Sequence, residues 1–250
     1  MKTKRGKAID NNHGIYEAVF QSWGLGWNKN ASIWYSTGKT PPLNSNLVTR
    51  TPGWKPDETF AKIDALCEAE GWEGWSIKDS FRVLNLEEYG FTVLFDSQWL
   101  YLDAAEFLPL PAGPGLSYTI VDDAHTLSLW KTAWEKNNTV KADAIYRDAI
   151  LEDPSMFFVV GRDGAGEVTS LCLLNKTDDV VGISNFYPPH GNVVAHWSDL
   201  IAFIQREFGE TDVVGYERPE LLSVLKPLGV EAVGDLCIWV KAGRNETARF

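Results

Sequence analysis

The sequence predicts an α/β (α+β) fold in which mixed, mostly antiparallel sheets are flanked by helices, arranged as two tandem units. Three Pro and two Gly between Leu108 and Gly115 forbid a continuing helix or central strand, so this segment is expected to link two units. Helical and strand periodicities alternate on both sides of it. A similar helix, glycine turn and strand end both parts of the chain. We therefore expect units at residues 1–112 and 116–250.

The first unit has the weaker pattern. The spacing of apolar residues predicts a helix over Gly14 to Gly24, followed by short strands at Ser32 to Tyr35 and Asn46 to Thr51. Asp57 is a plausible N-cap for a helix that ends at Gly71. A strand at Trp75 to Ile77, a short helix at Phe81 to Glu88 and a strand or hairpin at Phe91 to Leu102 complete this unit.

The second unit has clearer periodicity. It predicts two helices, one capped by Asp122 or Asp123 and one over Lys141 to Leu151. Hairpin signals then predict an antiparallel meander. The remaining elements are expected to alternate. The meander strands are Met156 to Val160, Val168 to Leu174 and Val180 to Phe186, and the later elements are a helix at Val193 to Phe208, a strand at Asp212 to Tyr216, a helix at Pro219 to Leu228 and a strand at Glu231 to Val240.

Charge and composition exclude several classes of protein. With 34 acidic and 23 basic residues the net charge is −11, and no basic run extends beyond the N-terminal tail, so a nucleic-acid partner is not expected. No apolar stretch approaches the roughly 18 residues of a membrane span, and no signal sequence follows Met1 to Lys7. We therefore expect a soluble, cytoplasmic protein with no membrane partner.

The cysteines and histidines do not suggest a metal site. Cys67, Cys172 and Cys237 are odd in number, widely spaced and set in apolar segments, so each is expected to be a small buried hydrophobe. No spacing of His, Cys, Asp and Glu is typical of a metal centre.

The order of elements in the second unit resembles the GCN5-related N-acetyltransferase (GNAT) superfamily. The specific matches are Asp163-Gly-Ala-Gly-Glu-Val168 after an apolar strand, Val181-Gly-Ile-Ser-Asn-Phe186 before a long helix, and Leu228-Gly-Val230 before the last strand. The resemblance covers about Leu116 to Ala242. It implies a sheet in which two neighbouring strands splay apart to hold acetyl-CoA or another acyl-CoA.

An internal echo extends this resemblance to the first unit. Leu86-Glu-Glu-Tyr-Gly-Phe91, followed by Trp99-Leu-Tyr-Leu102, is similar to Leu225-Lys-Pro-Leu-Gly-Val230, followed by Ile238-Trp-Val240. The first unit would then be a shorter, eroded GNAT-like unit. Chance similarity between two such segments is the alternative.

Two features that the superfamily uses for acyl-CoA are missing. Its Arg/Gln-x-x-Gly-x-Gly/Ala loop binds the pyrophosphate through backbone N–H groups at a helix start. Here the corresponding stretch, Asn185 to His196, has one Gly, no Arg or Gln, and two Pro that lack N–H groups. The superfamily's proton-donating Tyr is replaced by Leu225 in the second unit and by Leu86 in the first. The acyl-CoA motif is therefore degenerate.

The candidate site residues surround the expected cleft. The resemblance places Ser184, Asn185, Phe186, Tyr187 and Gly191 where a cofactor would bind. Glu217 and Tyr216, at a strand end, and His196, near a helix start, are the candidate catalytic residues, because Glu and His are common general bases. A helix-capping carboxylate at Glu217 and a solvated or locally bonded His196 are the alternatives.

The aromatic residues of the first unit also allow two interpretations. Most lie near Gly or Pro, so they line an aromatic cavity between the units or belong to the core. They are Trp23, Trp27, Trp34, Tyr35, Trp54, Trp72 and Trp75.

Two functions remain open from the sequence. One is an N-acyltransferase that acts on a small amine or amino-acid-like substrate with atypical acyl-CoA binding. The other is a non-catalytic or repurposed GNAT-like protein that binds a small molecule or a protein partner in the former acyl-CoA cleft. The oligomeric state is not predicted.

Overall fold

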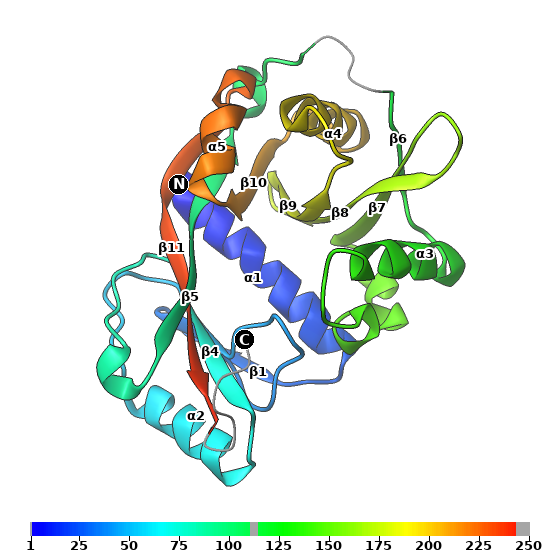
Figure 1. Cartoon of the computed structure of the whole chain (residues 1–250). Coiled ribbons are helices and arrows are strands. Elements are labelled where there is room, and N and C mark those ends of the chain that lie inside the picture. The colour runs from blue at the N-terminus through cyan, green and yellow to red at the C-terminus, as the bar shows by residue number, and fades with distance from the viewer. Residues whose placement is uncertain (1, 111–114, 244–250) are drawn as a thin grey trace.

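The computed structural model describes residues 2–110 and 115–243. Within these ranges, eleven strands form one sheet in the order β1-β2-β3-β4-β11-β5-β10-β9-β8-β7-β6 (Figure 1). The strands are β1 Trp27–Lys29, β2 Ile33–Ser36, β3 Leu47–Thr49, β4 Gly74–Asp79, β5 Thr92–Leu102, β6 Ser117–Ile120, β7 Met156–Arg162, β8 Val168–Thr177, β9 Val180–Tyr187, β10 Asp212–Glu217 and β11 Glu231–Ala242.

The helices lie on both faces of this sheet. They are α1 Lys4–Ser22, α2 Glu58–Ala69, α3 Ala124–Glu135, α4 Val193–Phe208 and α5 Pro219–Leu225, with single 3-10 turns between some elements. Figure 1 shows α1 running diagonally through the middle of the molecule, from the side of β11 toward α3. Asp57 and Asp123 cap α2 and α3 through their side chains, as the sequence predicts.

Only two of the strand pairs are parallel, β3 with β4 and β9 with β10. The other pairs are antiparallel. The prediction of a mixed, mostly antiparallel sheet flanked by helices is therefore confirmed.

The two parts of the chain exchange their last strands. β5, which ends the first part, pairs with β10 of the second part, and β11, which ends the second part, pairs with β4 of the first. β5 and β11 also pair with each other along most of their lengths. The sheet is therefore continuous across the molecule, and the division at residues 112 and 116 stays a prediction.

The alternation of side chains along the strands divides the core between the two faces. Trp34 and Val48 face α1, whereas their neighbours Ile33 and Leu47 pack with the buried residues of α2. In the second part, α1 and α3 cover one face and α4 and α5 cover the other. A continuous sheet with helices on both faces explains why the strands are apolar on both sides.

The echoed segments adopt similar structures. In each, a single 3-10 turn ends at a glycine with left-handed backbone, Gly90 (φ 81°) or Gly229 (φ 91°), and a long strand follows. A Cβ atom at Gly229 would lie 2.3 Å from the carbonyl oxygen of Glu106. The predicted glycine turn and strand are therefore present in both parts, but the predicted helix before the turn is present only in the second, and the helix at Phe81 to Glu88 is wrong.

Two predicted helices are absent for local reasons. At Phe81 to Glu88, the Asp79 carboxylate accepts backbone N–H groups of Phe81, Val83 and Leu84, which forms a turn instead of a helix. Lys141 to Leu151 contains two 3-10 segments, Ala142–Ala144 and Asp148–Glu152, separated by extended backbone at Arg147. The sequence analysis also missed β1 and β6, the short edge strands.

The cysteines and most first-part tryptophans belong to the core. Cys67, Cys172 and Cys237 are buried free thiols, as expected. Among the aromatic residues, Trp34, Trp54, Trp72 and Trp75 are buried with apolar neighbours, so the core interpretation is correct for these four. In the described ranges, no helix is both long and apolar enough to cross a membrane.

Two buried amide side chains, Asn11 and Asn175, join α1 to β8 by hydrogen bonds. Asn11 Nδ2 donates to the carbonyl oxygen of Asn175 (3.0 Å), and Asn175 Nδ2 donates to that of Asn11 (2.7 Å). Gly182 of β9 lies beneath them. A Cβ atom at that position would come within 1.9 Å of Asn11 Oδ1 and 2.4 Å of Asn175 Oδ1.

We predict that Gly182→Ala destabilises the protein, because the added methyl group must displace this amide pair. The free energy of unfolding should fall by about 1–3 kcal/mol, as in other overpacked cores. Thermal denaturation measures the loss. Gly164→Ala is the matched control, since no atom lies within 4 Å of its Cβ position. Equal melting temperatures for the two variants would contradict the prediction.

Candidate functional site

β9 and β10 part in the middle of the sheet. They pair in parallel from Val180–Asp212 to Ile183–Gly215, and the pairing stops there. The last two residues of β10, Tyr216 and Glu217, stay paired with Trp99 and Gln98 of β5, on the other side of β10. Among the described residues, no strand pairs with this edge of β9 beyond Ile183, so the edge is open to a ligand.

A β-bulge in β9 produces this divergence. Its register against β8 shifts between Leu173–Ser184 and Leu171–Tyr187, and Asn185 within the bulge has a positive φ of 50°. The Asn185 side chain holds the bulge in place. Its Oδ1 accepts from Trp134 Nε1 (3.2 Å), and its Nδ2 donates to the Tyr146 hydroxyl (2.9 Å).

The other predicted cofactor residues also line this region. Ser184 Oγ donates to the carbonyl oxygen of Leu173 (3.4 Å), and the Phe186 ring packs edge-on against Trp197 (5.3 Å between centroids). The Tyr187 hydroxyl exchanges hydrogen bonds with the Asn138 amide. Because these polar side chains bond within the protein, the free backbone of β9 is the better ligand-binding group.

The start of α4 lies just after this edge. Gly191 has a φ of 130° and open space at its Cβ position, and Asn192 caps the helix by accepting from the Ala195 N–H (3.2 Å). The N–H groups of Val193 and Val194 have no hydrogen-bond partner among the described residues. A helix N-terminus with N–H groups of this kind favours an anion.

Glu217 ends β10 at the opening. Its side chain is half-buried, and burial raises the pKa of its carboxyl to about 7, while the Arg218 backbone N–H and the Arg218 charge lower it. The N-cap of α5 is Arg218, which makes no side-chain cap bond. The Glu217 carboxyl interacts with the Arg218 backbone N–H at the start of α5, so its role at the helix start and its role as a base both stay predictions.

Tyr216 stands beside Glu217 but on the α1 face. Burial, followed by the nearby Tyr16 and Glu217, raises the pKa of its phenol. Within the described ranges its hydroxyl has no hydrogen-bond partner. In contrast, the three neighbouring tyrosine hydroxyls are engaged, those of Tyr16 with Ser45, Tyr146 with Asn185 and Tyr187 with Asn138.

His196 lies inside the structure and not at its surface. It is 3% exposed on α4, and its Nδ1 has no partner in the described part of the chain. The solvated alternative for His196 is therefore wrong. Among the described residues, no hydrogen bond or ion pair joins it to Glu217 or Tyr216, so a catalytic role for His196 remains a prediction.

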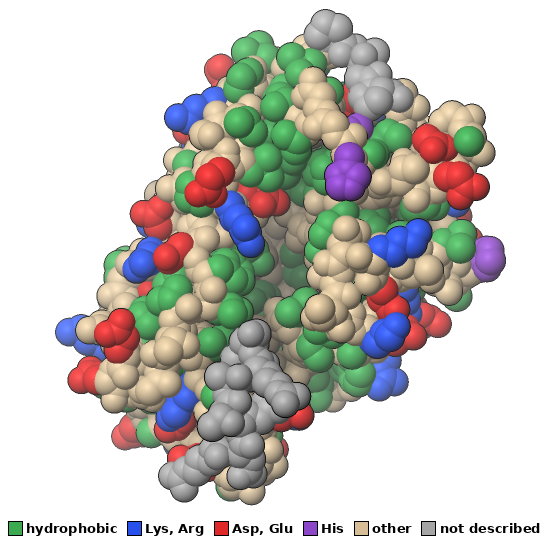
Figure 2. Space-filling model, in the orientation of Figure 1, with side chains coloured by type: hydrophobic (Ala, Val, Ile, Leu, Met, Phe, Trp, Pro, Cys, Tyr) green, Lys and Arg blue, Asp and Glu red, His purple; other side chains and the backbone are tan. Residues whose placement is uncertain are grey.

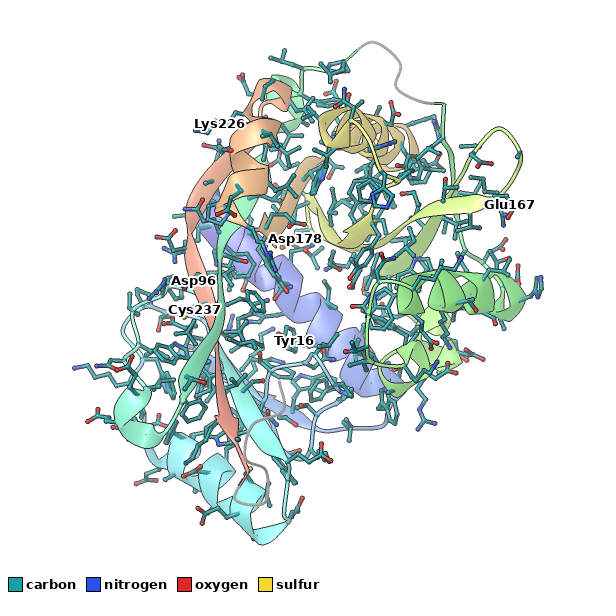
Figure 3. The ribbon with its side chains drawn as sticks, in the orientation of Figure 1. Tyr16, Asp96, Glu167, Asp178, Lys226 and Cys237 are labelled. Atoms are coloured by element: carbon teal, nitrogen blue, oxygen red, sulfur yellow. The ribbon has the colours of Figure 1, made fainter. Side chains whose placement is uncertain are left out.

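The face that carries the opening is hollowed along the middle of the molecule. Figure 2 shows this groove between the side of β5 and β11 and the side of α3 and α4. Tyr16 of α1 lies at the centre, between the two sides (Figure 3). The sequence analysis missed Tyr16, Lys78 and Trp99, which meet Tyr216 here, because they come from three elements far apart in the chain.

The equivalent position in the first part is closed. β3 and β4 pair in parallel at Leu47–Ile77 and Val48–Lys78. Immediately after these pairs, the Ser80 N–H donates to Thr49 Oγ1 (2.8 Å), and Arg5 Nη2 donates to the Ser80 carbonyl oxygen (2.9 Å). The Ser80 N–H and carbonyl groups are therefore hydrogen-bonded, whereas β9 and β10 do not pair at the corresponding position.

The leucines at the superfamily's tyrosine position are core residues. Leu86 and Leu225 are fully buried in apolar clusters. Neither position can donate a proton.

Within the described residues, no group of three or more His, Cys, Asp or Glu side chains could hold a metal ion.

Comparison with known proteins gives the same fold. A GCN5-related N-acetyltransferase from Kribbella flavida superposes with a TM-score of 0.65 at 14% identity, over 94% of this chain and 96% of that one. The chain has the GCN5-related N-acetyltransferase fold. The GNAT resemblance that the sequence predicts is therefore confirmed at the level of the fold.

Two further structures superpose over nearly their whole lengths. A conserved protein of unknown function from Staphylococcus epidermidis has a TM-score of 0.64 at 13% identity, covering 90% of this chain and 97% of that one. A GCN5-related N-acetyltransferase from Sphaerobacter thermophilus has a TM-score of 0.50 at 13% identity, covering 96% and 91%. No family model and no curated protein sequence matches the chain.

We predict that the buried lysine near Tyr216 destabilises the fold most at low pH. Burial lowers the pKa of Lys78 to about 7, against 10.5 for a free side chain. The unfolded chain therefore binds more protons between these values, and stability rises with pH across this window. Lys78→Met removes the effect. The free energy of unfolding of Lys78→Met minus that of wild type should be largest at about pH 6. This difference should shrink by up to about 5 kcal/mol as the pH rises to about 10.

Denaturant unfolding at several pH values measures this difference. Lys241→Met is the matched control, because Lys241 pairs with Asp64 (2.7 Å) and is half-buried. A pH-independent difference between Lys78→Met and wild type would show that Lys78 titrates normally.

Proposed function

We propose that the chain is an N-acyltransferase that transfers an acyl group from acyl-CoA to a small amine or amino-acid-like substrate. The observation that supports this most directly is the opening between β9 and β10, with Glu217 and the free Tyr216 hydroxyl at its mouth. The same fold is found in N-acetyltransferases. Because a fold alone does not imply a function, the Glu217 carboxyl and the Tyr216 hydroxyl are the features that support acyl transfer.

The retained groups suit an acyl-CoA. The unpaired edge of β9 beyond Ile183 would hold the amide-containing arm through backbone hydrogen bonds. The free N–H groups of Val193 and Val194 at the start of α4 would hold the pyrophosphate. Bound acyl-CoA supplies an activated thioester. Pro188 and Pro189 remove two N–H donors from the preceding loop, so we expect weak cofactor binding.

Glu217 is the proposed general base. A substrate amine is protonated near neutral pH and must lose a proton before it can attack a thioester. A carboxylate whose pKa is near 7 accepts that proton more readily than an ordinary glutamate, since the ideal base has a pKa near the working pH. The half-buried position also keeps the charge out of bulk water.

Tyr216 is the proposed proton donor to the leaving thiolate. Its hydroxyl is free within the described residues, unlike the tyrosine hydroxyls around it. It lies at the first β10 position that no longer pairs with β9. Tyr216 would therefore take the role that Leu225 cannot perform.

A binding protein without catalysis is the second candidate. The observation that favours it is the segment 188–192, in which Pro188-Pro-His-Gly replaces the superfamily's phosphate-binding loop and supplies no Lys or Arg. In that case the groove would hold a neutral or cationic small molecule or a protein segment. CoA binding separates this candidate from the first.

We predict that CoA and acetyl-CoA raise the melting temperature, because a ligand that binds only the native state stabilises it by mass action. A thermal-shift titration to millimolar ligand is the measurement. Val194→Pro removes one free N–H at the start of α4 and should weaken the shift. No shift in wild type at millimolar CoA would reject the acyltransferase and leave the binding protein.

We predict that turnover increases with pH until Glu217 is deprotonated. The rate of CoA release, assayed with a panel of small amines and amino acids, should rise about tenfold per pH unit below about 7, as Glu217 loses its proton. Glu217→Gln should lower kcat about 100-fold at higher pH and should remove this rise relative to wild type. The exposed Glu220→Gln is the matched control. An unchanged profile in Glu217→Gln would remove Glu217 from the mechanism.

A further inference from the structure

Lys78 is a buried cation without an anionic partner. It is 1% exposed on β4, and no carboxylate in the described residues forms an ion pair with it. One hydrogen bond, from its Nζ to Asn12 Oδ1 (2.7 Å), is its polar contact. An unpaired buried charge costs free energy, so a structural role alone does not explain it.

Aromatic rings surround the ammonium group. Its Nζ lies 3.9 Å from the centroid of the Tyr216 ring, 5.3 Å from that of Trp99 and 5.6 Å from that of Tyr16. These rings come from β10, β5 and α1. The contact with Tyr216 is the shortest, and it joins β4 of the first part to the candidate site in the second part.

The geometry excludes a direct contact between Lys78 and a ligand from solution. Lys78 is almost fully enclosed, whereas Tyr216 is only partly buried. The Tyr216 ring lies against the ammonium, and its hydroxyl is free among the described residues. An effect of Lys78 on a bound molecule therefore has to pass through Tyr216.

We propose that Lys78 is the positioning residue for Tyr216, and that its charge on the ring face makes the Tyr216 hydroxyl a stronger proton donor. This inference rests on the proposed function. In the step concerned, the amine nitrogen bonds to the acyl carbon, the carbon–sulfur bond breaks, and the electron pair leaves with sulfur. The nitrogen, now cationic, gives a proton to the Glu217 carboxylate, the O–H bond of Tyr216 breaks as its proton moves to the sulfur, and solvent carries the proton from Glu217 back to the phenolate.

The physical reason is the change in the ring's charge. A neutral phenol attracts the ammonium only through its quadrupole. As the proton leaves, the ring and its oxygen become an anion, and the attraction to a cation a few ångströms away becomes an ion–ion interaction in a buried setting. The ammonium therefore stabilises the donor more after proton transfer than before it. The first part of the chain would complete the site through this residue.

A double-mutant cycle tests the proposal. The variants are Lys78→Met, Tyr216→Phe and the double variant, with Lys78→Gln as a second neutral substitution. Lys241→Met is the control, because Lys241 also lies near an aromatic ring, Phe91, but outside the site. Melting temperature confirms that each variant folds. Two quantities are measured: kcat for CoA release from acetyl-CoA with the amine panel, and the thiolate absorbance of bound CoA as a function of pH.

Tyr216→Phe should lower kcat about 100-fold, and Lys78→Met about tenfold, with KM values unchanged. In the Tyr216→Phe background, Lys78→Met should have no further effect. Each single variant should also make the bound thiol about tenfold less acidic, because a hydrogen-bond donor and a nearby charge favour the thiolate. Lys241→Met should behave as wild type.

Other outcomes overturn the proposal. If the effects of the two substitutions multiply, Lys78 acts independently of Tyr216. If Lys78→Met raises the acceptor KM and leaves kcat unchanged, Lys78 contributes to substrate binding. If the thiol acidity and kcat of Lys78→Met equal those of wild type while CoA binds, the coupling does not exist. Absence of CoA binding in wild type would instead reject the proposed function, and this inference with it.

Discussion

The antiparallel pairing of β5 with β11 is the constraint on which the rest of the structure depends. Each strand ends one part of the chain and pairs with the sheet of the other part, β5 with β10 and β11 with β4. This exchange makes the sheet continuous and fixes the register between the two parts. It also places Trp99 and Lys78 of the first part against Tyr216 of the second.

The two parts share an arrangement of strands but differ at the position where it could bind a ligand. In the first part, Thr49, Ser80 and Arg5 bond the groups that would otherwise be free after β3 and β4. In the second, the bulge at Asn185 carries β9 away from β10, and hydrogen bonds from Trp134 and to Tyr146 hold it there. The two central strands of the second part therefore diverge, whereas the corresponding strands of the first part are joined by hydrogen bonds.

The chemistry at this cleft is displaced from the superfamily's usual positions. Leu225 packs in the core, whereas the hydroxyl of Tyr216, nine residues earlier on β10, has no hydrogen-bond partner in the described part of the chain. The helix start retains unpaired N–H groups although its loop contains two prolines. Glu217 gains a pKa near neutrality from its enclosure. These features are consistent with acyl transfer performed by a different set of residues in a familiar fold.

The sequence alone determined most elements through periodicity and turn chemistry. In α4, β5 and β7 to β11, the spacing of apolar residues matches the period of the helix or strand that they form. Periodicity and turn chemistry also made Tyr216 and Glu217, at the end of an apolar strand, candidate catalytic residues. Tertiary structure decided the rest. The exchange of β5 and β11, the Asp79 turn at Phe81 and the partners of Lys78 depend on contacts between residues far apart in the chain. The residues next to Lys78 in the sequence do not predict that three aromatic rings will surround it, because its burial depends on how the whole sheet assembles.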